Sequence, residues 1–178
     1  MQSAITSSSV TAPFETALGH CALRFSEAGI AEVIMPGSRA LKGPPLAPAE
    51  ELPTGVAKAI DGIVALLGGA QRDLRFVALD DRGLDSFRTK VYAATREIAP
   101  GETASYGAIA KAIGEPEAAR AVGAALGENP FPIVVPCHRV LSASGALHGF
   151  SAPGGIVTKR RMLEIERAPG FTQQALFA

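Results

Sequence analysis

The sequence changes character near residues 80–83, and this change constrains the fold more than any other feature. Before it, three short β-prone runs are separated by glycine-containing turns; they are residues 14–17, 20–25 and 30–35. Such runs predict an antiparallel meander. After the change, apolar residues recur at helical spacing. We therefore expect an α+β chain with two domains, residues 1–84 and residues 85–178.

The rest of the N-terminal part predicts one helix, one loop and one further strand. Residues 56–67 have the apolar spacing of a helix, which Gly68-Gly69 would end. Residues 35–53 contain five prolines and predict a loop. Residues 74–79 predict a strand. This part should thus form a small antiparallel sheet with one helix.

The C-terminal part reads as mostly helical. We expect helices over residues 85–100, 105–113 and 116–126, the last with Pro116 at its first position. Two short helices joined by a glycine-containing turn suggest a helix-turn-helix element. The second of them carries small residues and a single long basic side chain, Arg120. Its close approach could be to DNA or to a neighbouring helix, and spacing alone favours helix packing.

The sequence Pro136-Cys137-His138-Arg139-Val140 is the main candidate for chemistry. Prolines at 130, 132 and 136 favour extended backbone and would present Cys137 rigidly. An imidazole beside a thiol can accept its proton or stabilise the thiolate. A cysteine in an apolar stretch can instead be a small buried hydrophobe. The polar His-Arg pair after Cys137 favours the nucleophile.

Composition excludes several classes of protein. The 178 residues are 47% hydrophobic, enough for a substantial core, and the formal net charge is zero, which neither indicates nor excludes a nucleic-acid partner. The two cysteines are too far apart in sequence for a disulfide framework and match no zinc spacing. We expect a cytoplasmic protein with no membrane segment, no metal and no cofactor.

Five motifs, in this order and spacing, resemble the O6-alkylguanine-DNA alkyltransferases. They are Ser105-Tyr106, Arg120-Ala121-Val122-Gly123, Asn129-Pro130, Pro136-Cys137-His138-Arg139-Val140, and Lys159 followed by Glu166. The resemblance implies a supporting N-terminal domain and a C-terminal domain with a winged helix-turn-helix. It also implies that Cys137 irreversibly accepts the alkyl group of O6-alkylguanine in double-stranded DNA, once per molecule. Nothing in the sequence argues for oligomerisation, and we expect a monomer.

The resemblance also implies roles for residues around Cys137. His138 would accept the thiol proton, through a water because adjacent side chains seldom face each other, and Glu166 would orient His138. Glu164 is a rival, but the family spacing from the preceding lysine favours Glu166. Tyr106 would donate a proton toward N3 of the leaving guanine, and Asn129 would support the site. Each of these residues could instead have only a structural role.

Other residues are implied to contact DNA or the base. A base inside a duplex must be rotated out, and Arg120 would fill the gap. The implied DNA contacts are Arg120, Ala119, Ala121, Gly123, Ser105 and Arg139. The implied pocket residues are Pro132, Val140, Phe150, Ser151 and Lys159. Phe150 stands where the family usually has tyrosine, and the loop after it is about two residues longer, with Ala152-Pro153. We therefore expect a base pocket that differs from that of the family. His148 could narrow this pocket or be an ordinary exposed loop residue.

Two other functions are compatible with the sequence. A lesion-recognition protein would bind alkylated DNA without transfer, although such relatives lack the cysteine. A thiol hydrolase could use a Cys-His pair, but it would need an oxyanion hole that the sequence does not identify. Turnover separates the three, because only an alkyl acceptor is consumed one for one.

Overall fold

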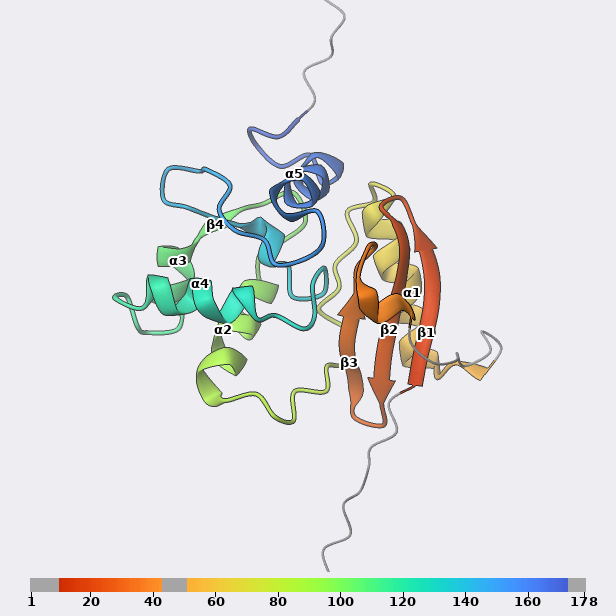
Figure 1. The fold of residues 1–178 in the computed structure, drawn as a ribbon. Helices are drawn as coiled ribbons and strands as arrows, with labels where there is room; N and C mark the ends of the chain where they lie inside the picture. Colours follow the sequence, from red (N-terminus) through yellow and green to blue (C-terminus); the bar gives the residue numbers. More distant parts are fainter. Residues whose placement is uncertain (1–9, 43–50, 173–178) are drawn as a thin grey trace, which may run out of the picture.

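A computed structural model describes residues 10–42 and 51–172 of the chain. Its N-terminal part is the predicted antiparallel meander, built from β1 (Val10–Thr16), β2 (Gly19–Ser26) and β3 (Gly29–Ile34) in the order β1-β2-β3. Helix α1 (Thr54–Leu67) ends at Gly68 as expected and packs on one face of the sheet (Figure 1). A side chain at Gly29 would come within 2.5 Å of the Ala78 carbonyl oxygen, so this turn requires glycine.

The predicted strand at residues 74–79 is wrong, and the predicted loop at residues 35–53 is described only in part. Residues 74–79 do not form a strand: Val77 N–H donates to the Leu74 carbonyl across a turn, and the Asp73 carboxylate accepts from Arg75 N–H at 2.7 Å. These local bonds compete with sheet pairing, which is reduced to one bridge between Ile30 and Leu79. The expected loop contains a short 3-10 helix, η1 (Arg39–Lys42), and its residues 43–50 lie outside the described residues.

The C-terminal part contains the predicted helices α2 (Ser86–Arg96), α3 (Tyr106–Ala112) and α4 (Ala119–Gly127). The Asp85 carboxylate and the Ser105 hydroxyl cap α2 and α3. The expected start of the last helix at Pro116 is wrong. Ala118 N–H donates to the Glu115 carbonyl, so Pro116 occupies the second position of a turn, where its fixed φ is also favourable.

The segment before Cys137 is not extended, contrary to the expectation from its prolines. Val135 N–H donates to the Phe131 carbonyl at 2.8 Å, and Ile133 adopts a φ of 75°, which is rare for a β-branched residue. Cys137 then begins a one-turn 3-10 helix, η3 (Cys137–Arg139). The chain is therefore rigid here through a buried turn.

Of the last elements, β5 (Val140–Leu141) belongs to the C-terminal part, and α5 (Gly155–Ile165) also contributes to the core of the N-terminal part. β5 pairs in parallel with β4 (Ala104–Ser105), and α5 lies above both parts in Figure 1. Ile133, Val134 and Met162 are buried in the same apolar cluster as the sheet and α1. The core beneath the three-stranded sheet is thus completed by C-terminal residues. Within residues 10–42 and 51–172, no helix is long and apolar enough to cross a bilayer.

Candidate active site

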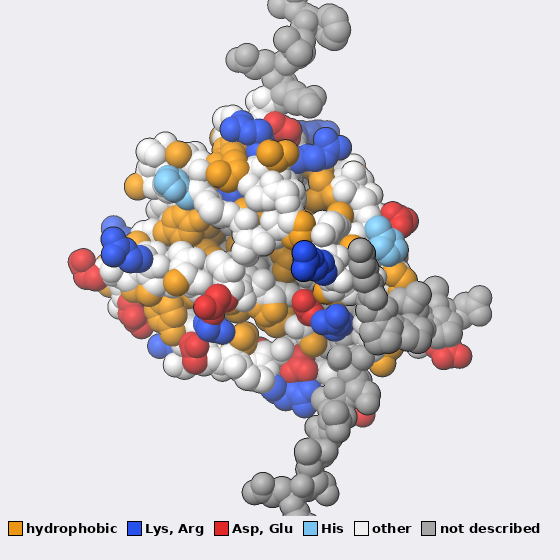
Figure 2. Space-filling model, in the orientation of Figure 1, with side chains coloured by type: hydrophobic (Ala, Val, Ile, Leu, Met, Phe, Trp, Pro, Cys, Tyr) orange, Lys and Arg blue, Asp and Glu red, His pale blue; other side chains and the backbone are white. Residues whose placement is uncertain are grey.

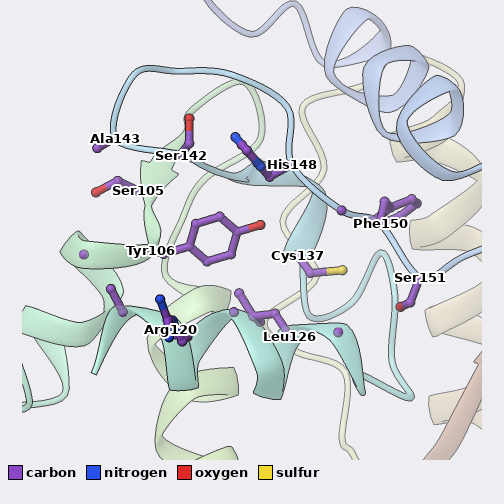
Figure 3. Close-up of a pocket in the computed structure, with 15 residues that line it drawn as sticks. Ser105, Tyr106, Arg120, Leu126, Cys137, Ser142, Ala143, His148, Phe150 and Ser151 are labelled. Atoms are coloured by element: carbon purple, nitrogen blue, oxygen red, sulfur yellow. The ribbon is translucent and has the colours of Figure 1, made fainter. Parts of the chain in front are cut away.

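A large open cavity of about 850 Å³ lies between the helix-turn-helix and the loop that follows β5. On the face in Figure 2, apolar side chains gather over this region, and Figure 3 shows the residues that line the cavity. Eight sequence-predicted residues line it: Ser105, Tyr106, Ala119, Arg120, Gly123, Cys137, Phe150 and Ser151. His148, which is exposed, also lines it. The fold therefore brings half of the predicted site residues to this one cavity.

Cys137 lies on the wall of this cavity with 8% of its surface exposed. Burial raises the pKa of its thiol, while the Asn129 side chain and the Lys159 charge act to lower it. Asn129 also braces the turn before Cys137, because its amide donates to the Val135 carbonyl at 3.0 Å and accepts from Phe131 N–H at 2.8 Å. The thiol is thus protonated at rest and firmly positioned.

His138 is fully buried and pairs with Glu166, as expected, rather than with Glu164. Its Nε2 lies 2.8 Å from Glu166 Oε1. Because an ionised carboxylate only accepts, Nε2 must carry the hydrogen and Nδ1 the lone pair. Nδ1 has no hydrogen-bond partner among the described residues. Burial lowers the pKa of His138, so its imidazole is neutral near pH 7 and Nδ1 can accept a proton.

Arg139 does not face DNA, contrary to the prediction. It is 5% exposed, and all three guanidinium nitrogens have partners inside the protein. Nε and Nη2 donate to the two oxygens of Glu166 at 2.8 and 2.7 Å, and Nη1 donates to the Ile98 carbonyl at 2.7 Å. Burial alone would raise the pKa of Glu166, but the charges and hydrogen bonds of His138 and Arg139 lower it to about 2. Arg139 therefore neutralises Glu166 and leaves His138 uncharged.

Lys159 and Val140 are not pocket residues either. Lys159 is 1% exposed, and its ammonium donates to the carbonyls of Val140 at 2.7 Å and His148 at 3.0 Å. Val140 is fully buried in the C-terminal core. Val140 contributes to this region through its carbonyl, which accepts from Lys159, and its side chain does not line the cavity. Lys159 joins β5 to the loop that borders the cavity, so it shapes the pocket from behind.

Tyr106 and α4 form the opposite side of the cavity. The Tyr106 hydroxyl points in the direction of Cys137 in Figure 3, and burial followed by the Cys137 charge raises its pKa, so it remains a proton donor. Helix α4 buries Val122, Ala125 and Leu126 against α2 and α3. It exposes Arg120 and Ala121 on its other side. The expected packing of this helix against its neighbours is confirmed, and contact of its exposed face with DNA stays a prediction.

Pro132 does not line the large cavity but a second one of about 130 Å³, which also touches Cys137. Its other wall comes from the N-terminal part, including Glu32, Met35 and Ser38. No motif in the sequence marks these three residues, because the N-terminal part resembles the family only in outline. Nor did any motif mark Leu126 and Ser142 in the large cavity. Nowhere in the described ranges do three His, Cys, Asp or Glu side chains gather as metal ligands would.

Comparisons with known proteins agree on one family. Residues 86–168 match the family described as 6-O-methylguanine DNA methyltransferase, DNA binding domain. The methylated-DNA–protein-cysteine methyltransferase of Mycobacterium tuberculosis is 46% identical over 125 residues, which are 70% of this chain and 73% of that protein. That of Mycobacterium leprae is 42% identical over 121 residues, 68% of this chain and 71% of that protein.

Solved structures show the same likeness over nearly the whole chain. The M. tuberculosis OGT in complex with DNA aligns with a TM-score of 0.73 and 36% identity, covering 90% of this chain and 96% of that one. The O6-methylguanine-DNA methyltransferase of the archaeon Pyrococcus kodakaraensis aligns with a TM-score of 0.64 and 27% identity, covering 88% of this chain and 99% of that one. The likeness thus includes both the sheet and the helical part.

Proposed function

The chain belongs to the methylated-DNA–protein-cysteine methyltransferase family, and from this premise we propose that Cys137 is the residue that takes the alkyl group from O6-alkylguanine. The protein repairs DNA by direct alkyl transfer to itself. Of its two cysteines, only Cys137 borders the large cavity among the described residues, while Cys21 is fully buried in β2. That difference carries the proposal.

The proposed reaction is a single displacement. The Cys137 thiol gives its proton to His138 Nδ1 through a bridging water. The resulting thiolate attacks the alkyl carbon. The C–O6 bond breaks as the C–S bond forms, and its electron pair leaves with the guanine. Tyr106 donates its phenolic proton toward N3 as negative charge develops on the base. The products are restored guanine and a thioether, so each molecule acts once.

The buried charge cluster supports this role for His138. Glu166 accepts the Nε2 hydrogen and so holds the ring in the tautomer that leaves Nδ1 free. When the ring is protonated, the same carboxylate stabilises its charge. Arg139 keeps Glu166 ionised and in place through two bonds. Glu166 is the orienting residue, and Arg139 positions Glu166.

The large cavity supports rotation of the base out of the duplex. A guanine must leave the stack to meet Cys137, at an unstacking cost of a few kcal/mol. Arg120 lies exposed at the rim of the cavity, on the free face of α4, where its side chain can fill the gap. Ala119, Ala121 and Gly123 allow the helix backbone to approach the minor groove closely. Ser105, at the start of α3, completes the contact.

The remaining parts of the proposal concern organisation. We propose that residues 1–84 support the alkyl-acceptor domain, residues 85–178, because both parts contribute to one buried cluster. A cytoplasmic location is supported by the two free cysteines, which a reducing compartment preserves. The protein would act as a monomer on damaged DNA.

Mass spectrometry after reaction with DNA tests the proposal. The full chain is incubated with a slight excess of duplex DNA that contains one O6-methylguanine, and protein mass, peptide mass and restored guanine are measured. We expect one methyl group on the Cys137 peptide per restored guanine. Cys137→Ala should bind DNA without transfer, and the matched control Cys21→Ala should react normally.

The other outcomes separate the competing functions. Binding of the lesion with both molecules unchanged would indicate recognition without transfer. Repeated turnover of a thioester or ester substrate would indicate a thiol hydrolase. A methyl group on Cys21 would overturn the assignment of Cys137.

A further inference from the structure

We propose that His148 binds a phosphate group of the extruded nucleotide, so that capture of the damaged base in DNA becomes more efficient as this histidine is protonated. The inference rests on the proposed function, in which the large cavity receives the base. The ligand is a phosphodiester group directly beside the O6-alkylguanine.

The position of His148 is the first argument. Its side chain is exposed and lines the large cavity from the loop after β5, and Figure 3 shows it across the Tyr106 ring from Arg120. The buried Lys159 ammonium donates to the His148 carbonyl at 3.0 Å and to the Val140 carbonyl at 2.7 Å. A fixed backbone therefore presents the imidazole at the edge of the base site.

The second argument is that the imidazole has no partner inside the protein. The other two histidines pair with carboxylates. His20 Nδ1 lies 2.5 Å from a Glu15 oxygen, and His138 Nε2 lies 2.8 Å from a Glu166 oxygen. Within the described part of the chain, neither ring nitrogen of His148 has a hydrogen-bond or ion-pair partner, and only its carbonyl is engaged. Both nitrogens are thus available to a ligand in the cavity.

The charge of the cavity lining is the third argument. Among the described residues, no aspartate or glutamate lines the large cavity, and only Arg120 and His148 offer side chains that can carry a positive charge. The base leaves the stack by rotation about its backbone, which brings the adjoining phosphates to the entrance of the pocket. Phosphate oxygens are the main acceptors of protein–DNA hydrogen bonds. Because Arg120 fills the gap in the duplex in the proposed function, His148 is the cationic group left for such a phosphate.

Protonation of His148 should control this contact. A histidine side chain changes its charge between about pH 5 and pH 8, and a protonated imidazole forms a charge-assisted hydrogen bond with phosphate. The charged and titratable groups that face His148 are Tyr106 on α3, Arg120 on α4, Cys137 on η3 and, behind the loop, Lys159 on α5. None of these is an anion at neutral pH, because burial raises the pKa of both Tyr106 and Cys137. The phosphate therefore has no competitor among them, and the contact should strengthen as pH falls.

A comparison of duplex DNA with free base tests the inference. Single-turnover rate constants of the unaltered protein and of His148→Gln are measured with O6-methylguanine in a duplex and with free O6-benzylguanine, which has no phosphate. At about pH 6, His148→Gln should lower the ratio of the duplex to the free-base rate constant about threefold to fivefold, and at about pH 8 less than about twofold. His20→Gln alters an exposed histidine on β2 that does not line the large cavity, and it should keep the ratio at both pH values.

A neutral phosphate analogue identifies the ligand. Two further duplexes carry a methylphosphonate, which lacks the negative charge, on the 5′ side or on the 3′ side of the O6-methylguanine. With one of these duplexes the effect of His148→Gln at low pH should disappear, and with the other it should persist. The duplex in which the effect disappears locates the phosphate that His148 binds.

Several results would overturn the inference. An equal loss on duplex and free base would mean that His148 only shapes the pocket. An effect that persists with both methylphosphonate duplexes, or that is the same at both pH values, would exclude a phosphate contact. His148→Asn is measured in parallel, and thermal unfolding confirms that every variant is folded. Failure of the proposed function would look different, because the unaltered protein would then leave O6-methylguanine in place.

Discussion

Arg139 and Arg120 were both expected to contact DNA, yet they occupy opposite environments. Arg139 is 5% exposed and directs every nitrogen to an acceptor inside the protein. Arg120 is exposed on α4 at the rim of the large cavity. A long basic side chain acquires its role from the acceptors within its reach, and only the fold brings Glu166 to Arg139.

Lys159 and Arg160 repeat the contrast on neighbouring residues of α5. Lys159 points inward and donates to two carbonyl groups, whereas Arg160 is exposed and stacks on Phe171. The sequence could not separate them, since both belong to one basic run. The buried Arg139 and Lys159 hold the active-site loops together. The exposed Arg120 and Arg160 remain available to DNA or solvent.

Removal of Arg139 should have the largest effect on stability. Arg139→Met leaves the buried Glu166 without its bidentate partner, and loss of one member of a buried pair typically costs about 3–5 kcal/mol. The free energy of unfolding, measured in urea, should fall by about that amount. The same substitution at the exposed Arg120 is the matched control and should change it by less than about 0.5 kcal/mol. Equal effects of the two substitutions would remove the distinction between them.

The pH dependence of stability should sharpen the contrast further. Glu166 has its pKa lowered from 4.5 to about 2, so its contribution is full above pH 4.5 and is lost as pH falls toward 2. The stability advantage of the unaltered protein over Glu166→Gln should therefore shrink by about 2 kcal/mol between pH 7 and pH 3.

Glu164→Gln provides the control for that measurement. Glu164 lies two residues earlier and makes no ion pair within the described part of the chain. Its stability difference from the unaltered protein should vary much less over the same pH range. A difference for Glu166→Gln that grows as pH falls would contradict the assigned direction of the pKa shift.

Arg120→Ala should have the smallest effect on stability and a specific effect on repair. The unfolding free energy should stay within about 0.5 kcal/mol, because the side chain is exposed. Single-turnover repair of O6-methylguanine in duplex DNA should slow at least tenfold, while reaction with free O6-benzylguanine base should be nearly unchanged. Lys111→Ala, at the exposed end of α3, is the charge-matched control. Equal losses on both substrates would exclude the gap-filling role.

Most elements of the fold could be predicted from local patterns. The meander, α1, α2 and α3 follow from apolar periodicity and from side chains that cap helices, such as Asp85 and Ser105. The errors at Pro116, at residues 74–79 and before Cys137 share a cause. In each, a hydrogen bond between nearby residues closes a turn that propensity alone does not reveal. Two geometries fit the same residues, and packing selects one.

The candidate site was predictable in part. The order and spacing of motifs resemble those of a known family and pointed to Cys137, His138 and Glu166. The structure brings His138 and Glu166 into contact. The sequence did not predict which cavity each residue of the loop after Phe150 would line. Phe150 and Ser151 border the large cavity, whereas Ala152-Pro153 line only the smaller one. The N-terminal wall of that cavity, with Glu32 and Ser38, had no signal in the sequence, because its residues lack any motif.

The sequence alone thus determined the family and the reacting groups, since these groups lie in short motifs that can be recognised by their spacing along the chain. The sequence did not determine which side chains are buried. Whether a charged side chain faces solvent or a partner depends on contacts between segments far apart in the chain, as between Arg139 and Glu166 or between Val33 and Pro130. Tertiary packing alone decided which basic residues hold the site together, which remain free for DNA, and how much space lies beside the sulfur.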